Sequence, residues 1–219
     1  MTPLPSAQKE RILRIAAELF AKNGYRATGV QELGKAVGLG RGALYYHIGS
    51  KEQLLFDIGF VHVEEMVEFG EALVEKESPA EEKIRELSRA LMRNIVDNLN
   101  EWTVFFHEAK SLTGRARKLI MARRQRYEQI WTDIVAQGTQ SGEFHAVDPV
   151  AIKGVLGMHN YSYIWIRERG RLEPEEIADA FCDIIMPGLL VRDSAHEPPR
   201  PPAGAKGKAA VGTREPRGG

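Results

Sequence analysis

The chain has 219 residues, of which 43% are hydrophobic and 27% charged, and its 30 basic and 30 acidic side chains give a formal net charge of zero. This composition is typical of a globular protein that is long enough to bury a core. The single cysteine, Cys182, excludes a disulfide framework and a cysteine-based zinc site, and it fits a reducing cytoplasm. No apolar run approaches the ~20 residues of a membrane-spanning helix, and the first residues lack the apolar segment of a signal peptide.

The zero net charge conceals an uneven distribution of charge along the chain. Residues 1–55 hold eight basic and four acidic side chains (+4), and residues 190–219 hold six basic and three acidic ones (+3). The stretch between them must therefore carry a net charge of −7, because the whole chain sums to zero. A basic head on an acidic body favours a polyanion as the partner of the N-terminal end.

Helix signals dominate the N-terminal part of the chain, and strand signals are nearly absent. The apolar spacing predicts three helices, over residues 6–23, 28–37 and 41–47. Thr28 and Gln31 form a capping box at the start of the second helix. Ser50 and Gln53 form another, which opens a long helix over 50–77.

The rest of the chain also consists of predicted helices. Ser78, Pro79 and Glu81 place an N-cap, a first-turn proline and an acid at the spacing of a helix start, and Asn100 caps a short helix after it. Further helices are expected over residues 116–140, 148–170 and 174–186. We therefore expect an all-α fold of about nine helices, with an N-terminal three-helix head and a larger helical body.

Residues 195–219 differ from the rest of the chain in composition. Five prolines and five glycines fall in these 25 positions, and Val211 is the one aliphatic residue larger than alanine. Such a segment buries too little apolar surface to offset the entropy lost on ordering it. We therefore expect a disordered tail.

Residues 28–51 contain the clearest functional pattern. A turn with Gly38 and Gly40 joins two short predicted helices there, which is the layout of a helix-turn-helix, whose second helix enters the DNA major groove. The exposed face expected for that helix has hydrogen-bond donors on four side chains, Arg41, Tyr45, Tyr46 and His47. Gly42 has no side chain to hold a phosphate away, and the helix N-termini near Thr28 and Ser50 can direct backbone N–H groups at phosphates.

The residues around this turn form a longer motif. It begins with Gly24-Tyr25-x-x-Thr28 and continues as Gly38-Leu39-Gly40-Arg41-Gly42-Ala43-Leu44-Tyr45-Tyr46-His47-Ile48-x-Ser50-Lys51-Glu52-x-Leu54-Leu55. Over about residues 8–58 the chain resembles the DNA-binding head of TetR-type transcriptional regulators. Two positions depart from the pattern of that family, because Gly40 stands where Ser or Thr is common and Ile48 where Phe is usual. Neither departure blocks DNA binding.

The resemblance implies contacts between this head and a double-stranded DNA operator. Arg41 would read a base, because a guanidinium can bridge O6 and N7 of guanine, and Gly42 would let the backbone approach the DNA. Tyr45 and Tyr46 would touch a thymine methyl group or a phosphate. Further phosphate contacts are implied for Thr28, His47 and Lys51. The residues alone also allow one tyrosine to pack in the core of the head and His47 to bond a backbone carbonyl.

The body resembles the same family in its last two helices. In TetR-type proteins the helices that correspond to 148–169 and 174–186 pair with a second copy, so the resemblance implies a homodimer whose heads read a palindrome. The stretch from Glu108 to Arg167 is similar to a subgroup that senses acyl-CoA thioesters in lipid or steroid breakdown. Those relatives tend to hold the CoA phosphates with Arg or Trp on the first of these helices. Here Arg123 and Arg124 would substitute, or the ligand is uncharged.

Polar side chains lie among aromatic ones in the body, and a small-molecule site has this composition. Arg123, Tyr127 and Trp131 share one helix face at successive i, i+4 steps. The residues expected to contact a small-molecule effector are Phe106, His107, Arg123, Tyr127, Trp131, Asn160 and Tyr161. Aromatic stripes at helical spacing also occur in filled cores, so the residues leave both interpretations open.

These observations lead to one functional hypothesis and two alternatives. We expect a ligand-responsive repressor with a DNA-binding domain over 1–55 and an effector-binding and dimerisation domain over 56–194, released from a palindromic operator by a hydrophobic or acyl-CoA effector. No HExxH or paired-carboxylate pattern occurs, so we expect no enzyme, no metal and no cofactor. The alternatives are an effector-independent DNA-binding activator and a helical lipid- or CoA-binding enzyme or carrier.

Overall fold

The computed structural model describes residues 7–167 and 170–191. Within these ranges the chain forms nine α-helices and two short 3₁₀ segments, and the one β-bridge joins Phe144 to Leu190. The prediction of an all-α fold is confirmed. None of the helices in the described part is long and apolar enough to cross a membrane. The tail expected over 195–219 lies outside the described residues, as does Ser6.

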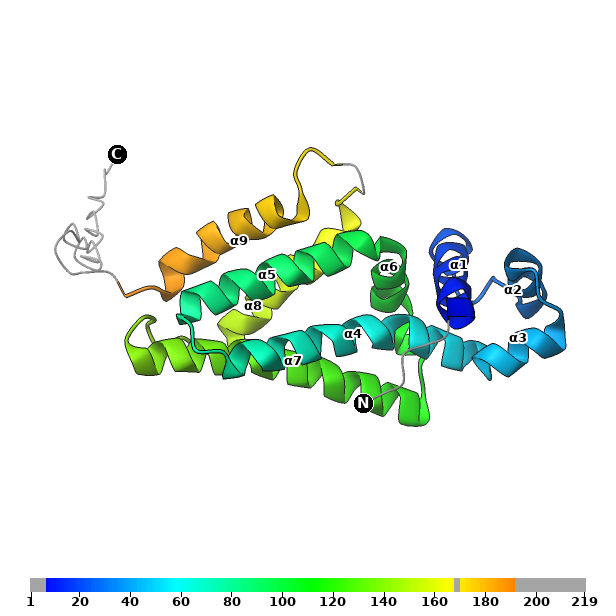
Figure 1. Cartoon of the computed structure of the whole chain (residues 1–219), viewed down its shortest axis with the longest axis horizontal. Coiled ribbons are helices and arrows are strands. Elements are labelled where there is room, and N and C mark those ends of the chain that lie inside the picture. The colour runs from blue at the N-terminus through cyan, green and yellow to red at the C-terminus, as the bar shows by residue number, and fades with distance from the viewer. Residues whose placement is uncertain (1–6, 168–169, 192–219) are drawn as a thin grey trace, which may run out of the picture.

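Three helices form a head at one end of the elongated molecule (Figure 1). They are α1 (Ala7–Asn23), α2 (Val30–Val37) and α3 (Arg41–Ile48). One face of α1 is buried against α2 and against the body, and α2 in turn packs on α3. The buried apolar residues of the head include Ile12, Ala16, Phe20, Leu33, Val37, Leu44 and Ile48. These head residues belong to the same continuous apolar core as the body, and the opposite face of α3 is left to solvent.

Two glycines shape the turn between α2 and α3. Gly38 ends α2 in the left-handed region (φ 71°), which costs a glycine little. The Leu39 N–H then donates to the Gly34 carbonyl at 2.9 Å, and a Cβ on Gly34 would lie 2.9 Å from the Leu39 carbonyl oxygen. The Arg11 guanidinium of α1 donates to the Val37 carbonyl at the same turn. These contacts fix the direction in which α3 leaves α2.

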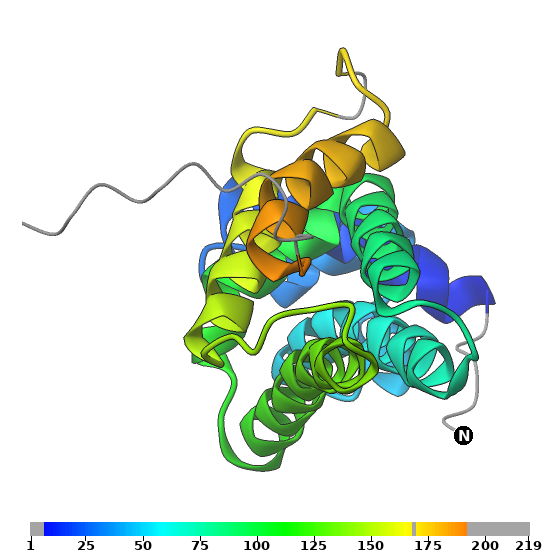
Figure 2. The same ribbon diagram turned by 90° about the vertical axis from the view of Figure 1, so that its left-hand side faces the viewer.

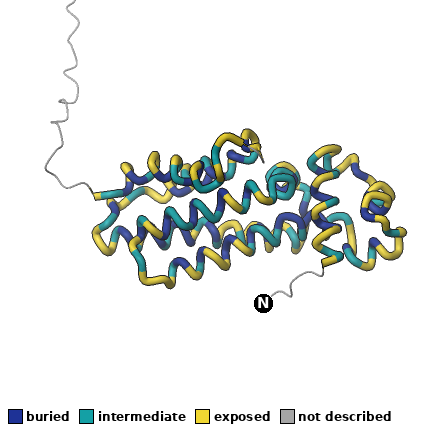
Figure 3. The backbone as a smooth tube through the Cα atoms, turned by 45° about the horizontal axis from the view of Figure 1, so that its top comes forward, coloured by how far each residue is buried: buried dark blue, intermediate teal, exposed yellow. Residues whose placement is uncertain are grey.

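Six helices build the body. They are α4 (Lys51–Glu75), α5 (Ala80–Asp97), α6 (Leu99–Glu108), α7 (Gly114–Ser141), α8 (Val150–Asn160) and α9 (Pro174–Leu189). α4 leaves the head and runs beside α7, while α6 packs against α1, so two helices connect the head to the body (Figures 1 and 2). Buried and exposed residues alternate along the body helices (Figure 3), as amphipathic helices around a shared core require.

Local helix-start signals were correct at one body helix and wrong at another. The Ser50 hydroxyl oxygen accepts a hydrogen bond from the Gln53 backbone N–H at 2.9 Å and caps α4, as predicted. The reciprocal half of the predicted capping box is wrong, because the Ser50 N–H donates to the Ile48 carbonyl and the Gln53 side chain donates to Asp57. The prediction for Asn100 is wrong, because α6 begins earlier, with Asn98 at the N-cap position. The Asn98 side chain donates to the Asn94 carbonyl instead of capping α6, so α5 and α6 meet with almost no loop between them.

The start of α5 is capped from a distant part of the chain. Ser78 does not cap it, and its buried hydroxyl has no hydrogen-bond partner among the described residues. A Glu143 carboxylate oxygen accepts from the Ala80 backbone N–H at 2.8 Å and from that of Glu81 at 3.4 Å. A carboxylate at a helix N-terminus also interacts favourably with the helix dipole. This cap ties the end of α7 to the start of α5.

The eighth helix is shorter than the pattern predicts. A single helix was expected over 148–170, but α8 ends at Asn160 and continues only as a 3₁₀ segment over Tyr161–Ile164. Gly154 and Gly157 weaken helix propensity in this stretch, and the Trp165 N–H bonds the Ser162 carbonyl at 3.1 Å in the tighter 3₁₀ pattern. The next helix, α9, runs through Pro187 to Leu189, slightly beyond its predicted end.

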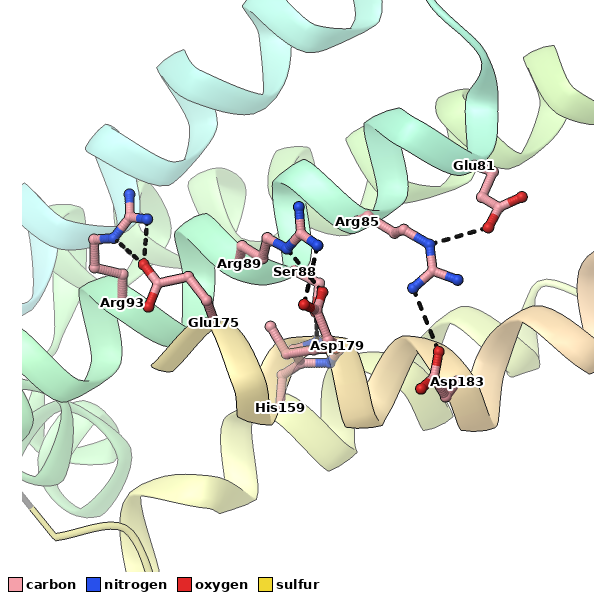
Figure 4. Close-up of polar contacts among 10 residues, drawn as sticks. Glu81, Arg85, Ser88, Arg89, Arg93, His159, Glu175, Asp179 and Asp183 are labelled. Carbon is pink, nitrogen blue, oxygen red and sulfur yellow. Dashed lines mark hydrogen bonds and ion pairs between the residues drawn. The ribbon is translucent and has the colours of Figure 1, made fainter. Parts of the chain in front are cut away.

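A ladder of ion pairs joins α5 to α9 (Figure 4). Three arginines four residues apart on α5 face three acidic residues four residues apart on the antiparallel α9, in the pairs Arg85–Asp183, Arg89–Asp179 and Arg93–Glu175. The Arg89 pair is bidentate, with N–O distances of 2.7 and 3.0 Å. Because exposed pairs contribute at most about 1 kcal/mol each, the ladder sets the register of α9 more than its stability.

A histidine is fully buried beside this ladder. His159 Nε2 lies 2.7 Å from the Ser88 hydroxyl and Nδ1 lies 2.8 Å from the Val155 carbonyl, while the rings of Trp131 and Phe181 pack on it. Burial lowers the pKa of His159 to about 4. The ring is therefore neutral at pH 7, with Nδ1 donating to Val155 and Nε2 accepting from Ser88.

Candidate functional site

The exposed face of α3 presents the side chains that the sequence motif singles out. Tyr46 is 87% exposed, Arg41 and Gly42 are also exposed, and Tyr45 and His47 are half-buried. The Arg41 guanidinium lies 5.7 Å from the centre of the Tyr45 ring. Helix α3 lies at the end of the molecule farthest from most of the body (Figure 1). Leu44 and Ile48 are buried beneath them, so α3 is anchored on one side and free on the other.

Lys51 lies behind this face at the start of α4. Its ammonium group sits 4.4 Å from the centre of the Tyr25 ring and 5.8 Å from that of Phe20. Burial lowers the pKa of Lys51, and the nearby Glu108 carboxylate partly offsets this effect. The cation is thus held by aromatic faces of the head, which restricts where it can meet a phosphate.

Thr28 does not occupy the position that the sequence predicts. The residue is completely buried, its hydroxyl donates to the Gly24 carbonyl at 2.9 Å, and Gly29 takes the N-cap position of α2. The prediction that Thr28 and Gln31 form a capping box is therefore wrong. Thr28 therefore does not lie with the exposed residues of α3 that are expected to contact DNA. Its hydroxyl bonds within the connection between α1 and α2 instead.

Replacing Gly42 by alanine separates the stability of the head from its function. A Cβ at this position meets nothing within 4 Å, so we expect Gly42→Ala to stabilise α3 by roughly 0.5 kcal/mol through helix propensity. The added methyl group would stand on the face proposed to approach DNA, and we expect roughly tenfold weaker DNA binding. Thermal unfolding and gel-shift titration of one preparation measure both quantities. Equal or tighter DNA binding would remove Gly42 from the contact surface.

The body contains a cavity of about 840 Å³ among α4, α6, α7 and α8. Its lining includes Val63, Met66, Trp102, Phe105, Phe106, Lys118, Arg124, Tyr127, Glu128, Lys153, Leu156 and Asn160. Three of the residues expected at an effector site are among them, namely Phe106, Tyr127 and Asn160. The buried Tyr127 hydroxyl has no hydrogen-bond partner in the described part of the chain, and burial raises the pKa of this group. The size and mixed lining suit a small-molecule ligand.

The other four expected residues lie outside the cavity lining. Arg123 forms an ion pair with Glu64, which turns it toward α4. Trp131 is 1% exposed and belongs to the core. His107 is exposed, and Tyr161 is 62% exposed. The structure thus does not bring these four residues to the cavity.

The cations of the cavity lining were only partly foreseen from the sequence. Lys118 and Arg124 come from α7, and Lys153 comes from α8; of these, Arg124 alone was considered for a ligand. The Arg124 guanidinium lies 5.7 Å from the centre of the Phe105 ring, and burial lowers its pKa. Arg124 and Glu128 are four residues apart, so their spacing in the sequence indicates that they share one face of α7. That pair is displaced by one residue from Arg123 and Tyr127, which the sequence predicts at the effector site.

Comparison with known proteins gives a consistent result. Residues 12–58 match the family model described as bacterial regulatory proteins of the tetR family, and residues 77–189 match the tetracycline repressor-like C-terminal domain. The crystal structure of the TetR family regulator PfmR from Thermus thermophilus is 36% identical, covers 81% of this chain and 98% of its own, and superposes with a TM-score of 0.77.

Two further relatives agree with these matches. AibR, solved with isovaleryl coenzyme A and operator DNA, is 32% identical, with 82% of this chain and 98% of its own covered and a TM-score of 0.72. The transcriptional repressor KstR2 of Mycolicibacterium smegmatis is 24% identical over 84% of this chain and 92% of its own length. Family members are DNA-binding regulators and not enzymes. The chain therefore belongs to the TetR family of bacterial transcriptional regulators.

Proposed function

We propose that the protein is a homodimeric repressor, acting in the cytoplasm, which a small-molecule effector releases from a palindromic operator. The observation that carries this proposal is that one chain contains both a recognition helix with a solvent-exposed face and a body cavity with a mixed apolar and polar lining. In this account residues 1–55 form the DNA-binding domain, and residues 56–194 bind the effector and the second copy.

The DNA contacts proposed here are those of the exposed head surface. Arg41 would read a base, Gly42 would allow close approach, and Tyr45 and Tyr46 would pack on thymine methyl groups or phosphates. His47 and Lys51 would contact phosphates. The burial of Thr28 removes it from this proposal.

Exposed apolar residues support dimerisation through α8 and α9. On the α8 side Val150 is 64% exposed and Trp165 48%, and on α9 Ile184 is 70% exposed. Large side chains of this kind are costly to leave in water and typical of a surface that a partner covers. Two copies paired here would present two α3 helices to successive major grooves.

The effector proposed for the cavity is a small hydrophobic molecule or an acyl-CoA thioester. The apolar lining suits an acyl chain, and AibR, a relative of known structure, binds isovaleryl coenzyme A. An effector acts only if it binds the two head arrangements with different affinity, so occupancy of the cavity must alter α4, which lines it and leads to the head.

A gel-shift titration with DNA that flanks the protein's own gene tests this function. We expect a retarded complex with two protomers per operator, released when octanoyl-CoA is added and kept when coenzyme A alone is added. A complex that survives a panel of acyl-CoAs and free lipophiles favours the effector-independent activator. Failure to retard any of this DNA at low salt contradicts the proposed function itself.

A further inference from the structure

The charges of the cavity are unbalanced toward the positive. Its lining includes three cationic side chains, Lys118, Arg124 and Lys153, and a single carboxylate among the described residues, that of Glu128. The apolar part of the lining comes mainly from α4 and α6, through residues such as Met66 and Phe105. The cations of the lining therefore all come from α7 and α8, while α4 and α6 contribute only apolar side chains to it.

The single carboxylate is engaged with one of these cations. Glu128 Oε1 lies 2.6 Å from Lys153 Nζ and links α7 to α8 at the solvent-accessible border of the cavity, where the Lys153 side chain is 63% exposed and that of Glu128 36%. The same carboxylate acts on Arg124, whose pKa it raises against the larger opposing effect of burial. Among the described residues, Arg124 has no ion-pair partner within contact distance, and its guanidinium rests over the Phe105 ring. Glu128 thus supplies the negative charge that a ligand anion would otherwise supply.

We propose that Glu128 is an internal counter-ion that the anionic group of the effector displaces, and that this exchange makes the cavity select amphiphilic anions over neutral lipophiles. The proposal rests on the effector-binding role given above and specifies its chemistry. An anion bound between Arg124 and Lys153 repels the Glu128 carboxylate. The ligand must therefore replace Glu128 as the ion-pair partner of Lys153. A fatty-acid carboxylate and the phosphates of a CoA thioester share this chemistry.

Two dyes with the same ring system and different charge test the proposal. We would titrate the full-length protein with the anionic 8-anilinonaphthalene-1-sulfonate and with the neutral N-phenyl-1-naphthylamine, and follow dye fluorescence. The variants are Glu128→Gln and Lys153→Gln. Matched controls are Glu86→Gln and Lys76→Gln, because that pair also has a 2.6 Å N–O distance, joins two segments of the body and lies outside the cavity lining.

We expect Glu128→Gln to bind the sulfonate dye about fivefold more tightly and Lys153→Gln to bind it about fivefold more weakly, the change that corresponds to about 1 kcal/mol. Binding of the neutral dye should change less than twofold in both. Displacement of the sulfonate dye by octanoyl-CoA, octanoate or octanol then distinguishes phosphate, carboxylate and neutral ligands. We expect either anion, and not octanol, to displace it more readily from Glu128→Gln.

Three results would overturn the proposal. Equal responses of the two dyes would show that the ion pair does not select charge, and the cavity would keep its role as an effector site. The same shifts in the Lys76 and Glu86 variants would indicate a general effect of net charge. If the wild-type protein binds neither dye and none of the octyl compounds, the effector role fails together with the counter-ion.

Discussion

Replacing both Arg41 and Tyr46 by alanine should weaken operator binding by about a hundredfold. A guanidinium that reads guanine contributes roughly 1–3 kcal/mol, and loss of an exposed ring at the interface adds about 1 kcal/mol. Together these losses approach the ~2.8 kcal/mol that corresponds to a hundredfold change in affinity. Both side chains are exposed in the free protein, so the free energy of unfolding should stay within about 0.5 kcal/mol of wild type.

Fluorescence anisotropy with labelled operator, at one fixed salt concentration, measures this loss. The matched control is Arg115→Ala with Phe69→Ala, which removes one arginine and one exposed ring from the body. We expect the control to bind operator within about twofold of wild type, since it keeps the α3 face intact. Equal losses in both double variants would mean that net charge, and not the surface of α3, controls affinity.

Acid should destabilise the protein through His159. The pKa of this residue is about 4 in the folded protein and 6.5 in an unconstrained chain. Below pH 6.5 the unfolded state gains a proton that the folded state does not, so stability falls as the pH falls from 6.5 and the loss is complete near pH 4. The full loss is about 3 kcal/mol, because each unit of pKa difference corresponds to about 1.4 kcal/mol.

Urea unfolding at pH 7, 6 and 5 would show this dependence. His159→Gln removes the titrating group, so the variant should lose less stability than wild type over the same range, and the comparison cancels the contribution of the carboxylates. The resonance of the His159 ring gives a second readout that does not depend on the variant's folding. A ring that protonates near pH 6.5 in the native protein would contradict the burial argument.

The helix-turn-helix was predictable from sequence because the contacts within it are local. Gly38 and Leu44 lie within the helix-turn-helix itself, and the motif around Tyr46 identifies the exposed face of α3 without knowledge of the body. Ser50 caps α4 from the adjacent residue, so its role follows from sequence spacing alone. The exception is Thr28, whose hydroxyl finds the nearer Gly24 carbonyl instead of the N-terminus of α2.

The cavity was less predictable because long-range packing decides it. α7 buries residues on several sides, so periodicity alone could not show whether Arg123 or Arg124 faces the cavity; one step along a helix turns a side chain by about 100°. Arg123 forms an ion pair with Glu64 of α4, and the two residues are 59 positions apart in the sequence. The cap that Glu143 provides for α5 spans a similar separation. Such partners are set by tertiary structure, which local patterns do not encode.

The central claim is that the tyrosine face of α3 enters the major groove in two copies. Cys182 is fully buried, so Tyr46→Cys offers one accessible thiol for a photo-crosslinker among the described residues. We expect crosslinks at two operator positions about one helical turn, or a multiple of it, apart, and none from the control Glu75→Cys at the far end of α4. Crosslinking from Glu75→Cys with none from Tyr46→Cys would contradict the account.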